Sequence, residues 1–367
     1  MIDVALLRTD PELVRRTVGQ RGVDVDVDRL IQVEDDLREA VARFTAVRTQ
    51  LRRQAMSREP ADTAAAQAVQ AEMAAATEKV RALQEVRDEL CGQLPNLLAP
   101  DTPTQGNVEL RRVGEPAAAD HARQHDTVGT ALGILARAAG TGYVWRGDGA
   151  RLVWAVLTHA QHLLRDRGFT PMLTPAEQAP IGYYGDQIVD AATLPVRLGA
   201  FSACPRAAAE AELPAAGHQV EQVVLCRPED ATRWLDECQR NAEDLLRDLE
   251  LPYRVVRVGL DELDAAAYQA YATEPWFPGC DAYLRTHTTS HCTDYPARRL
   301  KIRYLERGRV AQPHTLTATA VTDRTVLAIL ENHLQPDGSV RIPAALRPHL
   351  GGQELIAPPP PAAPSPG

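Results

Sequence analysis

Two long segments near the start of the chain repeat their apolar residues at helical spacing. The first follows steps of three and four through Leu30, Val33, Leu37, Val41, Phe44, Val47 and Leu51. After a break at residues 57–60, the second runs through Val69, Met73, Ala76, Val80, Leu83 and Leu90. An apolar stripe with this spacing, which we call a seam, is typical of paired helices. We therefore expect an antiparallel helical hairpin with helices roughly 45 Å long, at about 1.5 Å per residue.

Beyond a proline-rich segment at residues 99–106, helical and strand-like patterns alternate. Helices are expected at Leu152–Leu164 and Pro228–Asp248, and strands at Gln219–Cys226, Tyr253–Val258 and Arg298–Tyr304. This mixture predicts an α+β domain built on an antiparallel sheet. The expected organisation is a helical arm (1–105), a mixed domain (106–356) and a disordered proline-rich tail (357–367).

Composition narrows the class of protein. The 367 residues are 44% hydrophobic and carry a net charge of −9, which argues against a generally basic nucleic-acid binder, so no DNA partner is expected. The chain has no apolar run of 18 residues and no apolar leader, so neither a membrane span nor a signal peptide is expected. Its six scattered cysteines indicate reduced thiols and a cytoplasmic location.

The outer half of the first long helix is basic. Residues 40–58 contain no acid but five arginines, namely Arg43, Arg48, Arg52, Arg53 and Arg58. Such a stretch suits contact with RNA phosphates, and it equally suits a solvated helix face.

Eight segments follow one another along the chain in a recognisable order. They are MIDVALLRTDPELVRR, the arm closed by LPNL, NVELRRVGEP, GYVWRGDGARL, LPYRVVRVG, EPWFPG, CTDYPARRLKIRY and the terminal AILEN…DGSVRIP…LRPHLGG. The closing segment is the most informative, because Arg324 opens an apolar helix that is followed by a turn at Pro336–Gly338 and a short strand. Together these segments resemble seryl-tRNA synthetases over nearly the whole chain.

The resemblance implies a class II aminoacyl-tRNA synthetase domain with a six- to seven-stranded antiparallel sheet. It also implies a homodimer, formed through the helix from Arg151 and the strand that ends at Pro175. In this family the arm grips serine tRNA, so the resemblance makes Arg48, Arg52 and Arg53 plausible RNA contacts.

Three charged positions of the family's site are retained. The resemblance gives Arg206 the place of the arginine on the ATP α-phosphate, Arg324 that of the phosphate-binding arginine, and Glu221 that of a glutamate near the amino acid. Amino-acid activation brings a carboxylate to a phosphate, so the developing negative charge has to be neutralised. ATP is therefore a candidate cofactor.

Other positions depart from the family. Ala208 stands where a glutamate reads adenine, and Arg285 stands where a glutamate binds the metal ion. A guanidinium has no lone pair to offer a metal, which argues against Mg²⁺ at that position. The rest of the expected substrate pocket is also altered, with His287, Thr288 replacing serine and Thr317 replacing asparagine. The connection Ile181–Leu194 is short and lacks the family's Thr-x-Glu segment.

Four residues, His287, His291, Cys280 and Cys292, could suggest a zinc site. The histidine spacing would suit a helix, but this stretch aligns with a loop and a strand, so no zinc is expected.

Three functions remain open. The altered pocket favours a tRNA- or RNA-binding regulatory paralogue that has lost ordinary serine activation. The alternatives are a repurposed acyl-activating or aminoacyl-transferring enzyme of a specialised pathway, and a divergent but active serine–tRNA ligase.

Overall fold

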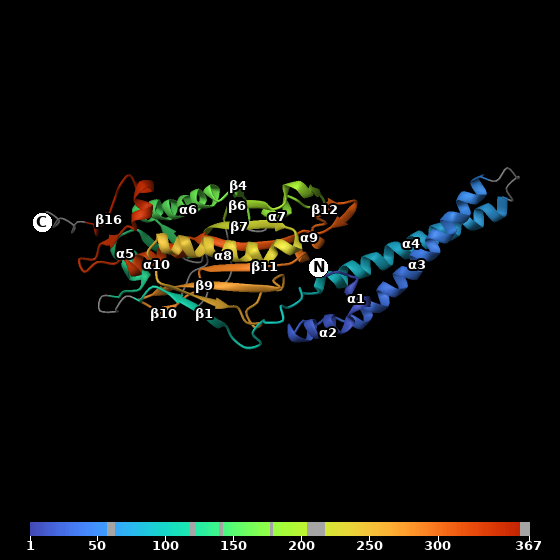
Figure 1. Cartoon of the computed structure of the whole chain (residues 1–367), viewed down its shortest axis with the longest axis horizontal. Helices are drawn as coiled ribbons and strands as arrows, with labels where there is room; N and C mark the ends of the chain where they lie inside the picture. Colours follow the sequence, from blue (N-terminus) through green and yellow to red (C-terminus); the bar gives the residue numbers. More distant parts are fainter. Residues whose placement is uncertain (57–62, 117–121, 139–141, 177–178, 204–216, 360–367) are drawn as a thin grey trace. The chain divides into compact units, whose positions relative to one another are not determined.

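The computed structural model describes residues 1–56, 63–116, 122–138, 142–176, 179–203 and 217–359, which form two compact units divided between Leu97 and Leu98. Its helices, drawn in Figure 1, are α1 Leu6–Thr9, α2 Pro11–Gln20, α3 Val27–Met56, α4 Thr63–Gln93, α5 His125–Ala131, α6 Asp148–Asp166, α7 Ala179–Gly182, α8 Ala231–Asp248, α9 Tyr295–Arg299 and α10 Arg324–Asn332. Short 3₁₀ turns are Ala191–Thr193, Pro228–Asp230 and Ala344–Leu350.

The strands are β1 Val108–Val113, β2 Leu135–Ala138, β3 Gly142–Trp145, β4 Thr170–Thr174, β5 Ile188–Asp190, β6 Val196–Ala203, β7 His218–Cys226, β8 Tyr253–Arg257, β9 Gln269–Phe277, β10 Ala282–Tyr283, β11 His287–His291, β12 Arg303–Glu306, β13 Arg309–Ala311, β14 His314–Thr322, β15 Val340–Arg341 and β16 Leu355–Ile356.

In the first unit α3 and α4 pack side by side as the expected hairpin (Figure 1). The buried seam of α3 differs from the expected one at Val41, and the expected Phe44 and Leu51 are only half-buried. Ala40 is buried and Val41 is 41% exposed, so the seam runs through Leu30, Val33, Leu37, Ala40 and Val47. Steps of three and four that alternate strictly keep the seam on one side of the helix, which two consecutive steps of four do not.

The second unit is built on a nine-stranded sheet with the order β1-β8-β9-β11-β14-β7-β6-β4, and β10 pairs with β9. All pairs are antiparallel except β4 with β6, so the sheet is larger than expected and not purely antiparallel. Strand β14 carries one irregularity, a bulge between Thr319 and Val321.

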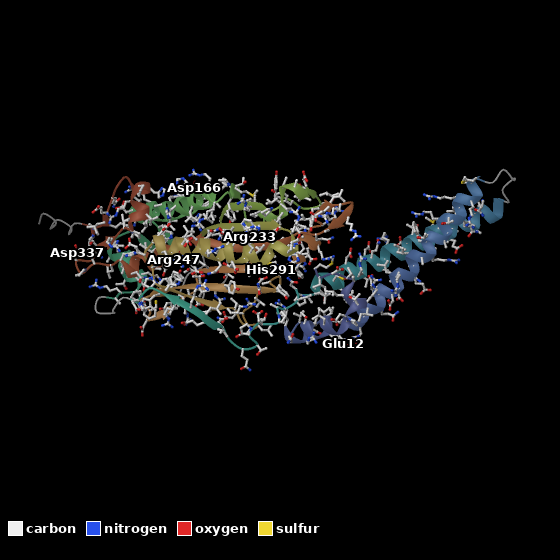
Figure 2. All side chains as sticks on the ribbon, viewed as in Figure 1. Glu12, Asp166, Arg233, Arg247, His291 and Asp337 are labelled. Carbon is white, nitrogen blue, oxygen red and sulfur yellow. The ribbon has the colours of Figure 1, made fainter. Side chains whose placement is uncertain are left out.

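Helices α6 and α8 cover one face of this sheet, which we call the helix face (Figure 1). The apolar side of α8 is buried there through Trp234, Leu235, Cys238, Ala242, Leu245 and Leu246, while Arg233 and Arg247 are exposed on its other side (Figure 2). Burying a leucine of this kind contributes about 1.5–3 kcal/mol.

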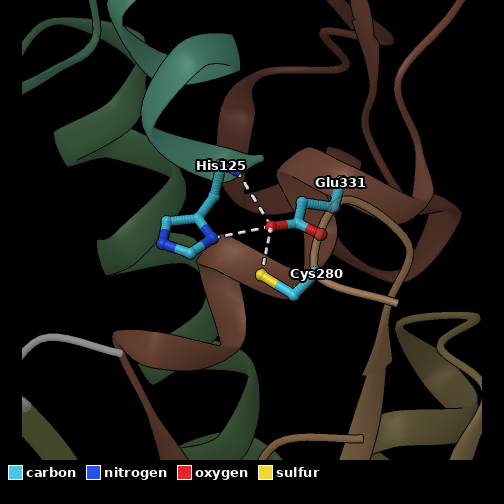
Figure 3. Close-up of side chains that lie close together, drawn as sticks. All are labelled: His125, Cys280 and Glu331. Carbon is cyan, nitrogen blue, oxygen red and sulfur yellow. Dashed lines mark hydrogen bonds and ion pairs between the residues drawn. The ribbon is translucent and has the colours of Figure 1, made fainter. Parts of the chain in front are cut away.

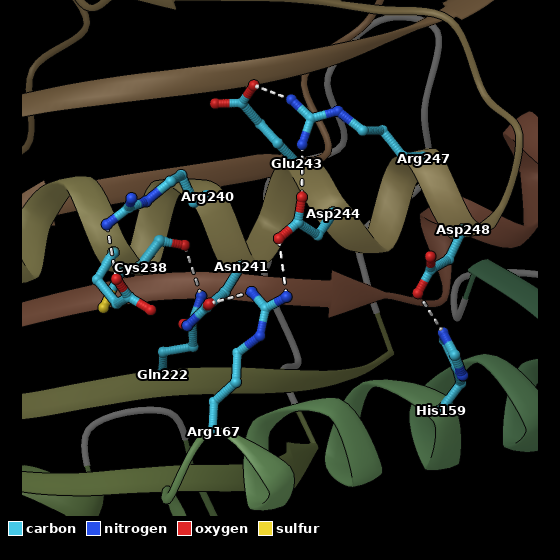
Figure 4. A network of polar contacts seen from close by, with 11 residues as sticks. His159, Arg167, Gln222, Cys238, Arg240, Asn241, Glu243, Asp244, Arg247 and Asp248 are labelled. Atoms are coloured by element: carbon cyan, nitrogen blue, oxygen red, sulfur yellow. Dashed lines mark hydrogen bonds and ion pairs between the residues drawn. The ribbon is translucent and has the colours of Figure 1, made fainter.

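Hydrogen bonds fix α8 to the strand beneath it. The Gln222 amide on β7 donates to the Cys238 carbonyl (3.0 Å) and accepts from Asn241 Nδ2 (2.6 Å), as Figure 4 shows. At the end of α6, Arg167 bonds both Asn241 and Asp244 of α8. Because the network is largely buried, water cannot replace a lost hydrogen bond, and each polar group relies on its protein partners.

One expected strand is wrong in its first half. Arg298 and Arg299 form the last turn of α9, and the strand begins only at Arg303. Proline at the second position of α9 favours a helix start, whereas the alternation of RRLKIRY alone suggested a strand.

Two buried histidines, His287 and His291, and the half-buried His314 lie on the helix face. Burial lowers the pKa of His287 to about 4, and burial followed by the neighbouring His314 lowers the pKa of His291 to about 4. His291 Nε2 lies 3.0 Å from His314 Nδ1, and burial lowers the pKa of His314 as well. The rings of His287 and His291 are therefore neutral at pH 7 inside the folded unit.

Because these folded-state pKa values lie below the unfolded value of about 6.5, the unfolded chain binds more protons between pH 6.5 and 4. The contribution of these histidines to the free energy of unfolding is therefore fully present above about pH 6.5, and it is lost as the pH falls toward 4. We predict that replacing His287 by Leu makes the loss of unfolding free energy between pH 7.5 and 5.0 smaller by about 2 kcal/mol. Urea denaturation followed by tryptophan fluorescence measures this, since all four tryptophans lie in this unit. Equal pH dependence for wild type and variant would contradict the prediction.

Candidate functional site

The face of the sheet opposite α6 and α8 carries a set of polar side chains, and we call it the site face. Side chains alternate along a strand, so Gln222 points to the helix face and its neighbour Glu221 to the site face. The register then extends the site face across the sheet. Glu221 pairs with Thr319 on β14 and with Ala200 on β6.

Further polar residues follow on the neighbouring strands. Ser290 of β11 pairs with Thr317 of β14, and Thr288 lies two residues away on the same face. Thr288 pairs with Ala272 of β9, so Glu274, two residues along β9, shares this face, and Glu274 pairs with Arg254 of β8. From β7 to β8 this row spans four strand spacings, roughly 19 Å. Glu221 and Glu274 are both about 5% exposed, whereas Thr288 and Thr317 between them are half-buried.

Two buried hydroxyls at one end of the row add to this picture. Ser202 and Thr322 both pair in register with Gln219. Within the described residues, Ser202 Oγ and Thr322 Oγ1 have no hydrogen-bond partner. Buried polar groups in proteins are nearly always bonded, so these two hydroxyls are exceptions at this end of the site face.

Arg324 opens α10 at the same end, two residues beyond the Thr322–Gln219 pair, and it is 6% exposed. The preceding residue, Asp323, accepts hydrogen bonds from the backbone N–H of Gly217 at 3.0 and 3.2 Å. Its carboxylate lies 3.9 Å from His218 Nδ1, and this partner raises the pKa of His218. Asp323 thus connects the start of α10 to the start of β7.

Arg285 lies at the other end of the row, between β10 and β11. Its guanidinium bonds Glu262, and its Nε is 3.9 Å from Glu274 Oε1. Glu274 is itself bonded to Arg254 at 2.7 Å. Among the described residues the Nε of Arg285 is buried without a hydrogen-bond partner. The end of the site face is therefore a cluster of arginines and carboxylates.

The structure brings together only some of the residues expected in the pocket. Glu221, Thr288 and Thr317 share the site face, and Arg285 joins them through Glu274. His287 pairs with Thr273, whose hydroxyl bonds Gln239 of α8, so His287 is on the helix face. Arg206, together with Ala208, lies outside the described residues.

Sequence reasoning missed Glu274 and Arg254 as members of this row. The signal was present, because Ala270, Ala272 and Glu274 occupy alternate positions of β9. What the alternation could not provide was the register against β8 and β11, which decides the neighbours.

One group of described residues has the composition of a metal site. His125, Cys280 and Glu331 place their ligand atoms within 4.8 Å of one another at the end of α10 (Figure 3). Glu331 Oε1 lies 2.6 Å from His125 Nδ1 and accepts the His125 backbone N–H at 2.9 Å, while Oε2 accepts Gly279 N–H at 2.7 Å. Two tetrahedral zinc ligands at about 2.1 Å from the ion would stand roughly 3.4 Å apart. The 2.6 Å between Glu331 Oε1 and His125 Nδ1 is shorter than this and is a hydrogen-bond distance. Glu331 therefore acts as a hydrogen-bonded carboxylate that connects α5 and the turn after β9 to α10.

In the arm, Arg48, Arg52 and Arg53 are exposed, and the Arg48 guanidinium lies over the Phe44 ring at 5.6 Å. Arg43 differs, because it forms an ion pair with Glu72 of α4. Arg58 lies outside the described residues. No described helix is long and apolar enough to cross a membrane.

Comparison with known proteins covers both units. The family model for the seryl-tRNA synthetase N-terminal domain matches residues 1–98, and that for the tRNA synthetase class II core domain (G, H, P, S and T) matches residues 165–333. The serine–tRNA ligase of Deinococcus radiodurans is 32% identical over 98% of this chain and 100% of its own length. That of Rubrobacter xylanophilus is 32% identical over 98% and 99%.

Solved structures agree with these matches. The seryl-tRNA synthetase of Pyrococcus horikoshii, solved in complex with ATP, superposes with a TM-score of 0.87 at 25% identity over 98% of this chain and 100% of that one. The cytoplasmic serine–tRNA ligase of Naegleria fowleri, solved with AMP, gives a TM-score of 0.85 at 24% identity over 97% of this chain and 99% of that one, and supports the fold.

The alignment with the Deinococcus protein extends over 423 residues, so this chain of 367 lacks segments that its relative has. The expected class II core with an N-terminal helical arm is confirmed, and the chain belongs to the seryl-tRNA synthetase family.

Proposed function

We propose that the protein is an ATP-dependent ligase that activates serine as an adenylate and transfers it to tRNA. The observation that carries this proposal is the full-length similarity to serine–tRNA ligases, which includes both the arm and the core. Of the three functions that the sequence left open, this similarity favours the active ligase.

The site face offers suitable groups for this chemistry. Arg324 supplies positive charge for the ATP phosphates, and the buried carboxylate of Glu221 suits the ammonium group of an amino acid. Arg206, which lies outside the described residues, is assigned the same phosphate-binding role from its motif position alone. The row of threonine and serine hydroxyls between Glu221 and Glu274 provides neutral hydrogen-bonding partners along the bound substrates. Positions held rigidly by a sheet cost little reorganisation when charge develops.

A second candidate is a paralogue that binds tRNA without activating serine. Arg285 in the row and the short connection Ile181–Leu194 favour it, because both change the surroundings of the substrate relative to the family pattern. A repurposed enzyme for another acyl group rests on the same two features.

We expect serine-dependent exchange of pyrophosphate into ATP by the full chain. Replacing Arg324 by Ala removes one preorganised cation and is predicted to lower kcat/KM about 10²–10³-fold. The control is Arg341→Ala, which removes an arginine that pairs with Glu250 outside the nine-stranded sheet and should leave exchange unchanged. Exchange with a different amino acid would identify a repurposed enzyme, and silence together with tRNA binding would support the paralogue.

The arm is proposed to bind tRNA through Arg48, Arg52 and Arg53. Within the described residues none of these three guanidinia is in an ion pair, so they are available to phosphates. The logarithm of the tRNA association constant falls linearly with the logarithm of the salt concentration. Replacing all three arginines by Ala should make this negative slope shallower by about 2 to 3, as expected for three lost phosphate contacts. Filter binding at several salt concentrations measures the slope. Arg81→Ala, which removes an arginine paired with Glu78 and Glu85, is the matched control, and an equal effect of both changes would reject these contacts.

We also propose a homodimer through α6 and β4. In the single chain Trp154 of α6 is 57% exposed and Leu173 of β4 is 79% exposed, and such large apolar side chains on adjacent elements mark a contact surface. Replacing Leu173 by Asp is predicted to shift the mass measured by light scattering from dimer to monomer. Leu305→Asp, at an exposed leucine of β12, should leave the mass unchanged.

A location in the cytoplasm stays a prediction. The described cysteines Cys91, Cys226, Cys238, Cys280 and Cys292 carry free thiols, which accords with a reducing compartment.

A further inference from the structure

Arg285 is placed to act on a ligand at the site face. Its side chain is 21% exposed, and its Nη2 donates to Glu262. Glu262 also accepts from Asn107 Nδ2 at 3.1 Å, so the carboxylate that holds Arg285 is itself held in place. The guanidinium is thus oriented from one side, while its buried Nε has no hydrogen-bond partner among the described residues. The exposed part of this oriented guanidinium can therefore offer N–H donors to a ligand.

The same surroundings do not fit a magnesium ion. Mg²⁺ requires oxygen ligands in near-octahedral geometry, usually with one or two carboxylates. Glu274, the carboxylate nearest to Arg285 on the site face, already bonds Arg254 at 2.7 Å. In the described part of the chain, the one group of three candidate ligands is His125, Cys280 and Glu331, at the end of α10. A fixed guanidinium beside Glu274 would in addition repel a cation.

We propose that Arg285 binds the nucleotide phosphates directly, with a positive charge that the protein supplies in place of a divalent cation at this position. The inference rests on the proposed ATP-dependent function and deepens it. A guanidinium presents N–H donors in a planar fork that matches two phosphate oxygens, and it keeps its charge at every physiological pH. The Nη2 of Arg285 bonds Glu262, its Nε lies 3.9 Å from Glu274 Oε1, and 21% of the side chain stays exposed. Nucleotide binding by this protein is therefore independent of Mg²⁺ at this end of the site.

Calorimetric titration of the full chain with a nonhydrolysable ATP analogue tests the inference. For the wild type the dissociation constant in EDTA should stay within about threefold of that in Mg²⁺. Arg285→Gln should weaken binding about tenfold or more in both buffers, because one charge-assisted contact is lost. Arg285→Glu introduces the carboxylate that the family pattern has, and it should bind poorly in EDTA and recover with Mg²⁺. Arg341→Glu makes the same charge change in an arginine paired with Glu250 and should change neither value.

A wild-type affinity that falls more than tenfold in EDTA overturns the inference, and so does unchanged binding by the folded Arg285→Gln protein, with folding checked by thermal unfolding. This failure is distinct from failure of the proposed function. Absence of serine-dependent pyrophosphate exchange rejects serine activation even when metal-independent nucleotide binding is observed. Absence of binding in both buffers rejects both statements.

Discussion

The antiparallel register of β7, β14, β11 and β9 is the constraint on which the rest of the second unit depends. Because consecutive side chains point to opposite faces, each strand contributes to the helix-covered core and to the site face at once. The neighbours Gln222 and Glu221 illustrate this division. One amide fixes α8 to the sheet, and the adjacent carboxylate lies on the other side in the polar row. The register that forms the core therefore also sets the positions of the polar row.

Paired charges govern the ends of the polar row. Glu262 and Glu274 flank Arg285, Arg254 bonds Glu274, and Asp323 connects the start of α10 to Gly217. Such pairs contribute little to stability when exposed, and a buried charge without its partner is costly. Their main effect here is orientation, because a guanidinium held by a carboxylate loses less freedom when a ligand arrives. The row combines a rigid sheet with side chains that are already directed.

Periodicity predicted most of the elements because each signal is local. The arm helices, α6, α8, β7 and β8 follow directly from apolar spacing. The failures occurred where a local pattern had two solutions. The alternation of Arg298–Tyr304 suited a strand, but the proline at the start of α9 favoured a helix. In α3 the small Ala40 is buried and the larger Val41 is exposed. The position of a residue in the heptad decides whether it faces the partner helix, even when its neighbour is more hydrophobic.

The site was harder to predict than the fold for the same physical reason. Thr288, Thr317 and Glu221 could be named from motif positions, but their common face depends on which strands pair and in which register. His287 is adjacent to Thr288 in sequence and still lies on the other face. Glu274 becomes a partner of Arg285 only when β9 is placed beside β11. Long-range pairing of this kind has no signature within a single segment.

The bulge in β14 has a consequence for how the chain can vary. Thr319 pairs with Glu221 and Thr322 with Gln219, three residues apart on one strand and two on the other, yet both threonines reach the same face. The extra residue resets the alternation just before Arg324, so it sets the rotational phase at which α10 leaves the sheet. Removal of one residue here would keep the composition of the motif but turn the start of α10 away from the polar row. Within this stretch, length is under tighter constraint than residue identity.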